Sequence, residues 1–397
     1  MKLNDDINQF IKQHLHESTE RIVLNIRNKF DIDPYFIIQQ INGRKKVAAK
    51  IPSWANNESI IFPNIVSFEQ CSSEATAGYK ARLIQGHHLV DLTGGFGVDT
   101  YFLAQKFKQV DYFEQNEALF DVVKNNYHQL QVSNIRMHHG NGIDFLENIQ
   151  HPVDWIYLDP SRRQADHSKI FLIEDCQPNI LEINDLLLAK AKNVLIKLSP
   201  MLDIDQIIRK VAGLQKIHIV SVKNECKEVL LHISATPNLL TPVALTAVNI
   251  HDHQNFDEFT TTMDKRKKEN ITIQLSKPLD YIYEPNKSIL KGNLQDYLAE
   301  TKQISKLNTH SNFFTSSDEK SDFPGRIFQV KTIIKLKKKQ ITKHLDKGKA
   351  NVISRNFPLK ASQIYEKFKI IPGGSTYLLA TKLKQNDNVL IVCERLK

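Results

Sequence analysis

The sequence predicts an α/β fold, in which a mostly parallel sheet lies between a helical N-terminal region and a C-terminal α+β module. Short apolar segments alternate with helical patterns over residues 86–236, which is typical of a parallel sheet with helices on both faces. Before this region, apolar residues such as Ile7, Phe10 and Ile11 recur at helical spacing. Longer strand patterns follow, and a turn at 323–325 divides them. We therefore predict four regions: a helical 1–85, the α/β 86–236, a β-rich connecting region 237–325, and the module 326–397.

Five short apolar runs in the central region are predicted as buried strands, at residues 88–92, 110–113, 135–139, 155–158 and 194–198. Helical patterns lie between them at 99–107, 117–130, 142–149 and 174–191. Two further strands, 217–222 and 228–234, are expected to close the sheet as an antiparallel pair. The last region contains strand patterns at 350–355, 377–383 and 389–395 and a helical pattern at 360–368.

The formal net charge of +9 is concentrated in one segment. Residues 326–349 hold nine cations and one acid, Asp346, so this segment carries 9 − 1 = +8. We call it the basic block, and its cations are Arg326, Lys331, Lys335, Lys337, Lys338, Lys339, Lys343, Lys347 and Lys349. Such a local excess of positive charge predicts a polyanionic partner such as RNA. The alternative is a lysine-rich face that is merely solvated.

Several protein classes are disfavoured by what the sequence lacks. The four cysteines are far apart and form no CxxC pair, so no zinc site or disulfide framework is expected. The histidine pairs have no third ligand at helical spacing, and no metal is expected there either. No apolar run reaches membrane-spanning length, and the N-terminus does not resemble a secretion signal. A cytoplasmic location is therefore expected.

A glycine loop follows the first predicted strand. The strand ends at Asp91-Leu92-Thr93 and continues into Gly94-Gly95-Phe96-Gly97, where glycines allow a sharp turn and a close approach to a ligand. Asp99 and Thr100 are expected to cap the following helix. The dinucleotide fingerprint of dehydrogenases needs a further glycine where Thr100 stands, which disfavours that class. An acid before the loop, Asp91, suits the cationic α-amino group of a bound methionine.

Two polar residues follow the next strands. Glu114 lies about 20 residues past the loop, where an acid binds the ribose hydroxyls of a nucleoside. Asn141 follows the third strand and is a candidate for contact with an adenine amine. The alternatives are that Glu114 is an acid at a helix N-terminus and that Asn141 is an ordinary turn residue.

The fourth strand ends in Asp159-Pro160-Ser161-Arg162-Arg163. A carboxylate beside a free carbonyl can orient an exocyclic amine, and methyl transfer needs little more than alignment of the reacting atoms. We predict Asp159 and Pro160 at the acceptor amine. Arg162 and Arg163 are expected at a phosphate or stacked on a base. The alternative is a helix-capping Asp followed by two surface arginines.

The glycine loop, Glu114 and Tyr157-Leu158-Asp159-Pro160 together resemble class I S-adenosylmethionine-dependent methyltransferases. More narrowly, they are similar to bacterial small-subunit ribosomal RNA guanine-N2 methyltransferases. The chain from about residue 67 onward looks closest to bacterial methyltransferases with a C-terminal THUMP-like domain. The motifs that carry this resemblance are Glu69-Gln70-Cys71-Ser72-Ser73-Glu74-Ala75-Thr76, Asp159-Pro160-Ser161-Arg162-Arg163, Tyr283-Glu284-Pro285-Asn286, Phe323-Pro324-Gly325-Arg326 and Ser354-Arg355-Asn356-Phe357-Pro358.

The resemblance implies a Rossmann-like sheet, ferredoxin-like and THUMP-like elements at the C-terminal end, and an RNA-contacting role for the last module. It also implies an S-adenosyl-L-methionine pocket at Asp91, Thr93, Gly94, Gly95, Gly97 and Glu114. One departure is that Ser161 and Arg162 stand where amino-methyltransferases usually have a proline and an aromatic residue. Stacking on a target base must then come from elsewhere.

We therefore predict an S-adenosylmethionine-dependent methyltransferase that acts on RNA, at a base amine such as guanine N2. One alternative is a methyltransferase for a small molecule or a protein. Another is an RNA-binding protein whose methyltransferase-like domain is inactive. Two segments are secondary candidates: the helix that contains Ser72 to Lys80, which either closes over the cofactor or is a plain capped helix, and Lys197-Leu198-Ser199-Pro200, which would line the substrate side.

Overall fold

The computed structural model describes residues 5–26, 30, 33–162, 172–237, 242–252, 255–263, 271, 273–383 and 387–397, without the side chains of Leu24 and Arg162. These residues divide into two compact units. Unit 1 comprises Met1–Ile217 and Glu228–Thr241, and unit 2 comprises His218–Lys227 and Pro242–Lys397. Within the described parts of the chain, no helix is long and apolar enough to cross a membrane.

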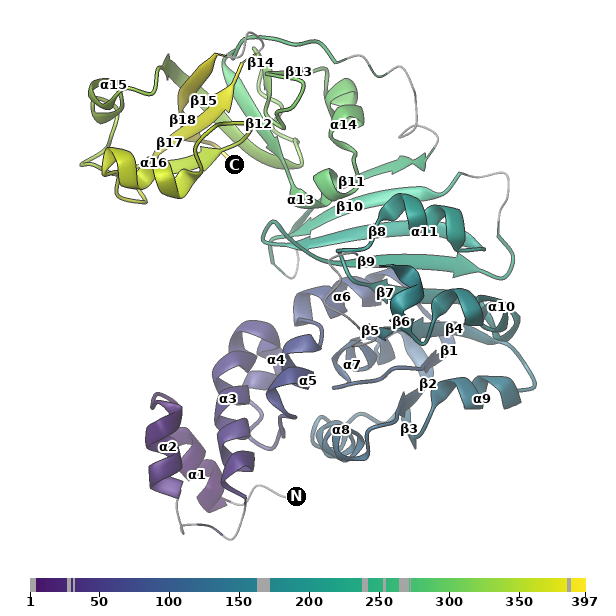
Figure 1. The fold of residues 1–397 in the computed structure, drawn as a ribbon. Coiled ribbons are helices and arrows are strands. Elements are labelled where there is room, and N and C mark those ends of the chain that lie inside the picture. Colours follow the sequence, from purple (N-terminus) through teal and green to yellow (C-terminus); the bar gives the residue numbers. More distant parts are fainter. Residues whose placement is uncertain are drawn as a thin grey trace. The chain divides into compact units, whose positions relative to one another are not determined.

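Unit 1 begins with helices, as predicted (Figure 1). They are α1 (Asp5–Gln13), α2 (Thr19–Ile26), α3 (Pro34–Lys50), α4 (Pro52–Ala55), α5 (Ile65–Gln70) and α6 (Glu74–Leu83). Apolar residues of α1, α2 and α3 form one buried cluster, which includes Phe10, Ile22 and Ile41. Asp33 caps α3 by accepting a hydrogen bond from the Tyr35 N–H, and Pro34 occupies the first turn, where no donor is needed.

The sheet of unit 1 has parallel strands, as predicted. Its five parallel strands are β1 (Gly86–Asp91), β2 (Phe107–Glu114), β3 (Ile135–His139), β4 (Val153–Leu158) and β7 (Ala191–Leu198), arranged β7-β4-β1-β2-β3. The chain passes from β1 outward to β3 and then returns to β4 on the other side of β1. The strand order therefore reverses between β1 and β4, and this is where doubly wound sheets bind ligands.

Helices follow the strands of this sheet. They are α7 (Val98–Ala104), α8 (Glu117–Gln129), α9 (Gly142–Asn148), α10 (Ile180–Lys190) and α11 (Ile204–Lys210). A short antiparallel pair, β5 (Ser161–Arg162) and β6 (Cys176–Gln177), lies between β4 and α10. The strand β9 (Glu225–Ser234) is antiparallel to β7, whereas β8 (Leu214–Val222) begins in unit 1 and ends in unit 2.

Two expectations about helix starts were wrong. Asp99 and Thr100 do not cap α7, because the capping position is Gly97 in the left-handed conformation and both side chains point to other partners. The helix expected at 174–191 begins only at Ile180, because residues 173–175 form a 3₁₀ turn, β6 follows, and Asn179 caps the helix through the Leu181 N–H.

Unit 2 contains an antiparallel hairpin and a seven-stranded sheet. The hairpin is β10 (Ala244–Ile250) with β11 (Phe256–Thr262). The sheet, in the order β13-β14-β12-β15-β18-β17-β16, comprises β12 (Tyr281–Pro285), β13 (Ser305–Lys306), β14 (Phe314–Ser316), β15 (Gly325–Ile334), β16 (Asn351–Ser354), β17 (Thr376–Lys382) and β18 (Asn388–Arg395). The helices described in unit 2 are α13 (Lys287–Lys291), α14 (Gln295–Lys302), α15 (Lys338–Thr342) and α16 (Ala361–Phe368).

The sheet of unit 2 is buried on both faces. Alternate residues of a strand point to opposite faces, and in β18 Leu390 joins one apolar cluster while Ile391 joins another. The first cluster also contains Ile341 of α15 and Ile364 of α16, so these helices cover that face. The strands of this module are therefore held by packing on both sides.

Two helical glycines in unit 1 give a paired prediction for stability. A Cβ on Gly43 in α3 would lie 2.2 Å from the Phe62 ring, whereas a Cβ on Gly78 in α6 would meet nothing within 4 Å. We expect Gly43→Ala to lower the free energy of unfolding by about 1–3 kcal/mol through overpacking. Gly78→Ala should raise it by up to about 1 kcal/mol, because alanine favours the helix.

Urea unfolding followed by tryptophan fluorescence measures both effects, since Trp54 and Trp155 are the only tryptophans and both are buried in unit 1. Equal effects of the two substitutions would contradict the packing described for Gly43.

Candidate active site

The ends of β1, β2 and β4 are joined by hydrogen bonds from the glycine loop. The Thr93 hydroxyl accepts the N–H of Asp159 at 2.7 Å, which links the loop to the residue after β4. The Gly94 N–H donates to the Phe113 carbonyl at 2.8 Å, and the Gly95 N–H donates to Glu114 Oε2 at 3.0 Å. The structure therefore brings the loop, Glu114 and Asp159 together at the carboxyl edge of the sheet, where the strand order reverses.

The loop glycines are required for different reasons. A Cβ on Gly94 would lie 2.0 Å from the Tyr112 ring, and one on Gly97 would lie 2.4 Å from the Tyr127 hydroxyl, so packing excludes a side chain at both positions. Gly95 has φ +57°, and its nearest neighbour to an added Cβ is a backbone oxygen at 3.8 Å. Gly95 thus needs the left-handed conformation, but it faces open space.

Asp91 is completely buried, and its carboxylate binds the start of the glycine loop through hydrogen bonds. One of its carboxylate oxygens accepts the Thr93 N–H at 3.0 Å, and the other accepts the Thr100 hydroxyl at 2.5 Å. Burial raises the pKa of Asp91 to about 7, although these two hydrogen bonds lower it. Contact between Asp91 and a methionine amino group remains a prediction.

The two other proposed nucleoside contacts are engaged locally. Glu114 accepts the Gly95 N–H through Oε2 and the Asn116 N–H through Oε1 at 2.7 Å. Asn141 caps α9 by accepting the Ile143 N–H at 3.1 Å, and its amide donates to Asp144. Glu114 is therefore tied to the glycine loop, whereas the described contacts of Asn141 belong to its own helix. Their roles toward ribose and adenine remain predictions.

Asp159 forms an ion pair with Lys197 on the neighbouring strand β7. The Asp159 side chain is 34% exposed, whereas that of Lys197 is 13% exposed. Burial lowers the pKa of Lys197, but Asp159, Asp99 and Glu228 outweigh this effect and hold it above its ordinary value. Lys197 is therefore a fixed cation at the site. Pro160 is partly exposed beside Asp159. The backbone of Arg162, in β5, pairs with that of Cys176, in β6, and Arg163 lies outside the described residues.

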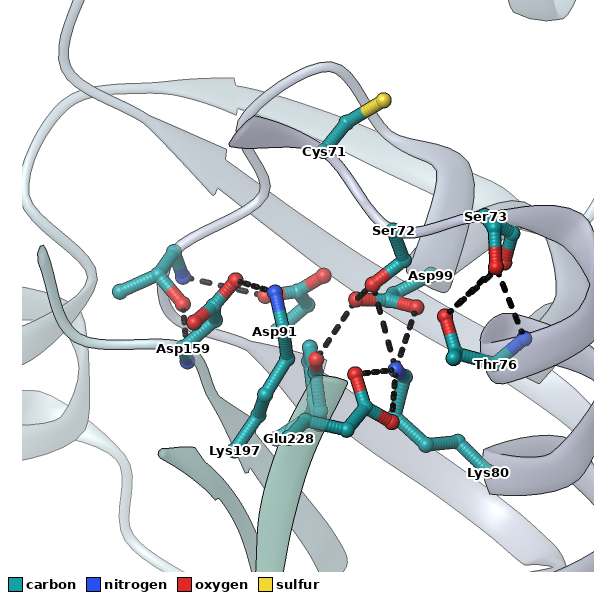
Figure 2. A network of polar contacts seen from close by, with 12 residues as sticks. Cys71, Ser72, Ser73, Thr76, Lys80, Asp91, Asp99, Asp159, Lys197 and Glu228 are labelled. Atoms are coloured by element: carbon teal, nitrogen blue, oxygen red, sulfur yellow. Dashed lines mark hydrogen bonds and ion pairs between the residues drawn. The ribbon is translucent and has the colours of Figure 1, made fainter. Parts of the chain in front are cut away.

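The buried side chain of Lys80, in α6, contacts α7 and β9 beside this site (Figure 2). The Lys80 side chain of α6 has no exposed surface, and its ammonium group contacts both Glu228 oxygens at 2.8 Å and Asp99 Oδ1 at 3.2 Å. Ser72 accepts a hydrogen bond from Lys80 at 3.2 Å and donates one to Asp99 Oδ2 at 2.7 Å. The Tyr157 hydroxyl of β4 also donates to Asp99 Oδ2, at 2.7 Å.

Glu228 was not among the predicted site residues, and Lys80 was predicted only as part of a candidate helix. The signal in the sequence that could have pointed to Glu228 is its position, as an acid directly before the apolar run 229–233. Burial raises the pKa of Glu228 above its ordinary value. Burial also raises that of Asp99, but Lys80 and Lys197 outweigh this and keep it below its ordinary value. The helix α6, which Ser73 caps, thus contributes the buried ammonium group of Lys80, and this group contacts Asp99 just after the glycine loop.

Carboxylates outnumber cations in this cluster. Among the described residues, two cations, Lys80 and Lys197, form ion pairs with the four carboxylates Asp91, Asp99, Asp159 and Glu228 or lie near them, which gives 2 − 4 = −2 when these six groups are ionised. Because charges interact strongly away from water, such a site favours a ligand that carries positive charge.

The basic block is exposed in unit 2. Its eight lysines are all exposed, whereas Arg326 is half-buried. Lys331 pairs with Glu394 at 3.2 Å and Lys335 with Asp387 at 3.4 Å, but exposed ion pairs of this kind contribute only about 0–1 kcal/mol. The block is therefore available to a polyanion.

We expect Lys80→Met to lower the free energy of unfolding by about 3–5 kcal/mol, because Glu228 and Asp99 would be left as buried, unpaired carboxylates. The matched control is Lys12→Met in α1, since Lys12 pairs with Glu58 and both side chains are about half exposed. The control should change stability by less than about 1 kcal/mol. Tryptophan-monitored urea unfolding measures both variants, and a loss in the Lys80 variant no larger than in the control would contradict the described network.

Comparison with known domains identifies the C-terminal modules. Residues 325–395 match a model of the THUMP domain-like family, and residues 281–324 match a ferredoxin-like domain model. No curated protein matches the chain.

Solved structures extend the likeness to the whole chain. A candidate methyltransferase of Porphyromonas gingivalis W83 is 29% identical, the match covers 100% of both chains, and the TM-score is 0.86. A candidate methyltransferase of Streptococcus mutans, solved in complex with SAH, is 15% identical over 41% of this chain and 96% of its own, with a TM-score of 0.31. An rRNA methylase of Streptococcus thermophilus is 16% identical over 40% and 93%, with a TM-score of 0.30.

The predicted resemblance and fold class are confirmed by the full-length match and the two domain models. The chain is a protein of the class I methyltransferase fold, with a helical N-terminal region and with ferredoxin-like and THUMP-like domains at its C-terminal end.

Proposed function

We propose that this protein is an S-adenosylmethionine-dependent methyltransferase that acts on RNA, at a base amine such as guanine N2. The observation that carries the proposal is the position of Asp159. Its backbone N–H is held by Thr93 of the glycine loop, and its partly exposed carboxylate stands at the strand-order reversal. An acceptor held by Asp159 would lie beside whatever the loop binds.

The residues at the loop fit the cofactor. S-adenosylmethionine carries a sulfonium and an ammonium group, and the cluster behind the loop has an excess of carboxylates. Gly95 faces open space in a conformation that glycine adopts easily. We assign the methionine end to Asp91, Thr93 and the three glycines Gly94, Gly95 and Gly97, the ribose to Glu114, and the adenine to Asn141. When bound, the cofactor supplies an electrophilic methyl group.

Asp159 is assigned to the acceptor amine. Its ion pair with Lys197 uses Oδ2, and we assign the amine N–H to Oδ1. Pro160 fixes the backbone and offers no donor, so carbonyl groups nearby can accept from the same amine. The acceptor nitrogen would take the methyl group that the bound cofactor supplies, and Asp159 would accept the proton that the nitrogen loses and release it to solvent. The chief contribution of the protein is alignment.

Support for RNA as the substrate comes from unit 2. THUMP domains bind structured RNA, and a THUMP-like model matches residues 325–395. The exposed lysines of the basic block lie in this same module. A small-molecule or protein acceptor would leave both features unused. Arg162, which follows the Asp-Pro pair, is assigned to a phosphate or a base of the same RNA.

Cofactor binding is tested at Gly95. Asparagine tolerates the left-handed conformation, so Gly95→Asn adds a side chain at the loop with little backbone strain. We expect its affinity for S-adenosylmethionine, measured by calorimetry, to fall by more than about tenfold, because the added side chain would occupy space that the cofactor needs. A tenfold loss corresponds to about 1.4 kcal/mol of binding free energy. The control is Gly348→Asn, where φ is +80° and an added Cβ meets nothing within 4 Å. Unchanged affinity in the Gly95 variant would contradict the loop assignment.

Catalysis is tested at Asp159. Asp159→Asn should reduce methyl transfer by about 100-fold or more, as for loss of a positioned acid–base group, while S-adenosylmethionine affinity stays within a few-fold. Transfer is measured with methyl-labelled cofactor and total RNA from cells that lack the gene, and mass spectrometry of nucleosides identifies the product. Asp185→Asn, an exposed carboxylate on α10, is the control. Near wild-type transfer by the Asp159 variant would sink the catalytic assignment, and label in protein or small molecules instead of RNA would sink the substrate assignment.

A further inference from the structure

Three motifs that are far apart in the sequence meet in unit 2. Glu284, in β12, pairs with Arg326 at 3.2 Å and with Arg355 at 2.7 Å. Glu284 and Arg326 are also opposite each other in the register of β12 and β15. Arg355 follows β16, which is at the far edge of the sheet order, so this ion pair joins segments that are far apart in the order of the strands.

The two arginines lie at a pocket of about 520 Å³. We call it the Arg326–Arg355 pocket. The residues that line it include Arg326, Arg355, Asn356, Phe357, Lys360 and Ala361. Sites for small molecules commonly measure roughly 300–1,000 Å³. The pocket therefore has room for one nucleotide but not for a duplex.

The pocket is built to hold an anion. Its charged residues are Arg326, Arg355 and Lys360 against Glu284, which gives 3 − 1 = +2. The Glu284 side chain is only 4% exposed, whereas those of Arg326 and Arg355 are 34% and 41% exposed. The buried acid thus fixes the two guanidinium groups, and their outer surfaces remain accessible.

Both arginines keep donors for a ligand. A guanidinium has five N–H donors. The described contacts with Glu284 and the Ser354 carbonyl use one nitrogen of Arg326 and two of Arg355. Fixed guanidinium groups of this kind suit the oxygens of a phosphate.

The N-terminus of α16 adds a second set of donors at the pocket. Lys360 and Ala361 line it, and α16 begins at Ala361. The Lys360 side chain caps no N–H of the first turn. The Lys360 N–H itself donates to the Gln363 side chain at 2.8 Å, so the donors left for a ligand are those of the first turn, from Ala361 onward. A helix N-terminus with free N–H groups attracts phosphate.

We propose that the Arg326–Arg355 pocket binds the phosphate of an unpaired RNA nucleotide, with the base beside Phe357 and Asn356. This rests on the proposed function, in which RNA is the substrate. The hydrogen bond of 3.2 Å from Asn356 to Asn308 fixes the Asn356 amide, and Phe357 offers an apolar surface to a base. Because the pocket admits one nucleotide, it selects a strand whose bases are free to leave the stack.

Binding of the full chain to a fluorescent single-stranded RNA of mixed sequence, and to the same strand annealed to its complement, tests the pocket. Wild-type protein should prefer the single strand. Arg355→Gln and Lys360→Gln should each weaken single-strand binding by about tenfold, the loss expected for a charged hydrogen bond. Each should also lower the slope of log affinity against log salt by about 0.7. Lys360 lies outside the Glu284 pairs, so its variant keeps the test valid if the Arg355 variant fails to fold.

Two controls separate the pocket from general electrostatics. Lys367→Gln removes the same charge from the other end of α16, away from the pocket, and should change affinity by less than about twofold, as for a solvated cation. The quadruple variant Lys335→Gln, Lys337→Gln, Lys338→Gln and Lys339→Gln should weaken binding of the single strand and of the duplex to the same extent.

Wild-type affinity in both pocket variants, or an equal loss in the Lys367 variant, would overturn the proposal. So would a wild-type protein that binds no single strand. Calorimetry with S-adenosylmethionine then shows separately whether the methyltransferase assignment survives.

Discussion

The Lys80 ammonium group is the interaction on which the site of unit 1 depends. It lies without exposed surface between Glu228 of β9 and Asp99 of α7, and it comes from α6. A buried cation is tolerated only when opposite charges and hydrogen bonds surround it. The positions of these three elements are therefore coupled. The hydrogen bond from Tyr157 to Asp99 links them to β4, the strand that precedes Asp159.

The parallel sheet and the glycine loop could be predicted because their signals are local. A buried strand is a run of apolar residues, and a turn that needs positive φ contains glycine. The same holds for Thr93, Gly95 and Glu114, which follow strands whose carboxyl ends must share one edge of a parallel sheet. This part of the site needed no knowledge of contacts between distant segments.

The charge network could not be predicted in the same way. Lys80 and Glu228 are 148 positions apart, and neither residue carries a local sign of its partner. Asp99 and Thr100 are good helix-capping types, yet Gly97 occupies the capping position and their side chains bind Lys80 and Asp91 instead. Likewise, the pairing of Glu284 with both Arg326 and Arg355 joins segments that are far apart in the sequence. Residue type predicts chemistry, but burial and distant partners decide how it is used.

The buried carboxyl group of Asp91 has a consequence for the energetics of binding. A pKa of about 7 means that the group is near half protonation at neutral pH. A positive ligand within reach of its field favours the ionised form, so such a ligand would displace a proton as it binds. Affinity would then rise as the pH increases toward 7 and level off above it. Binding of a cationic ligand beside Asp91 would thus exchange a proton for the positive charge of the ligand.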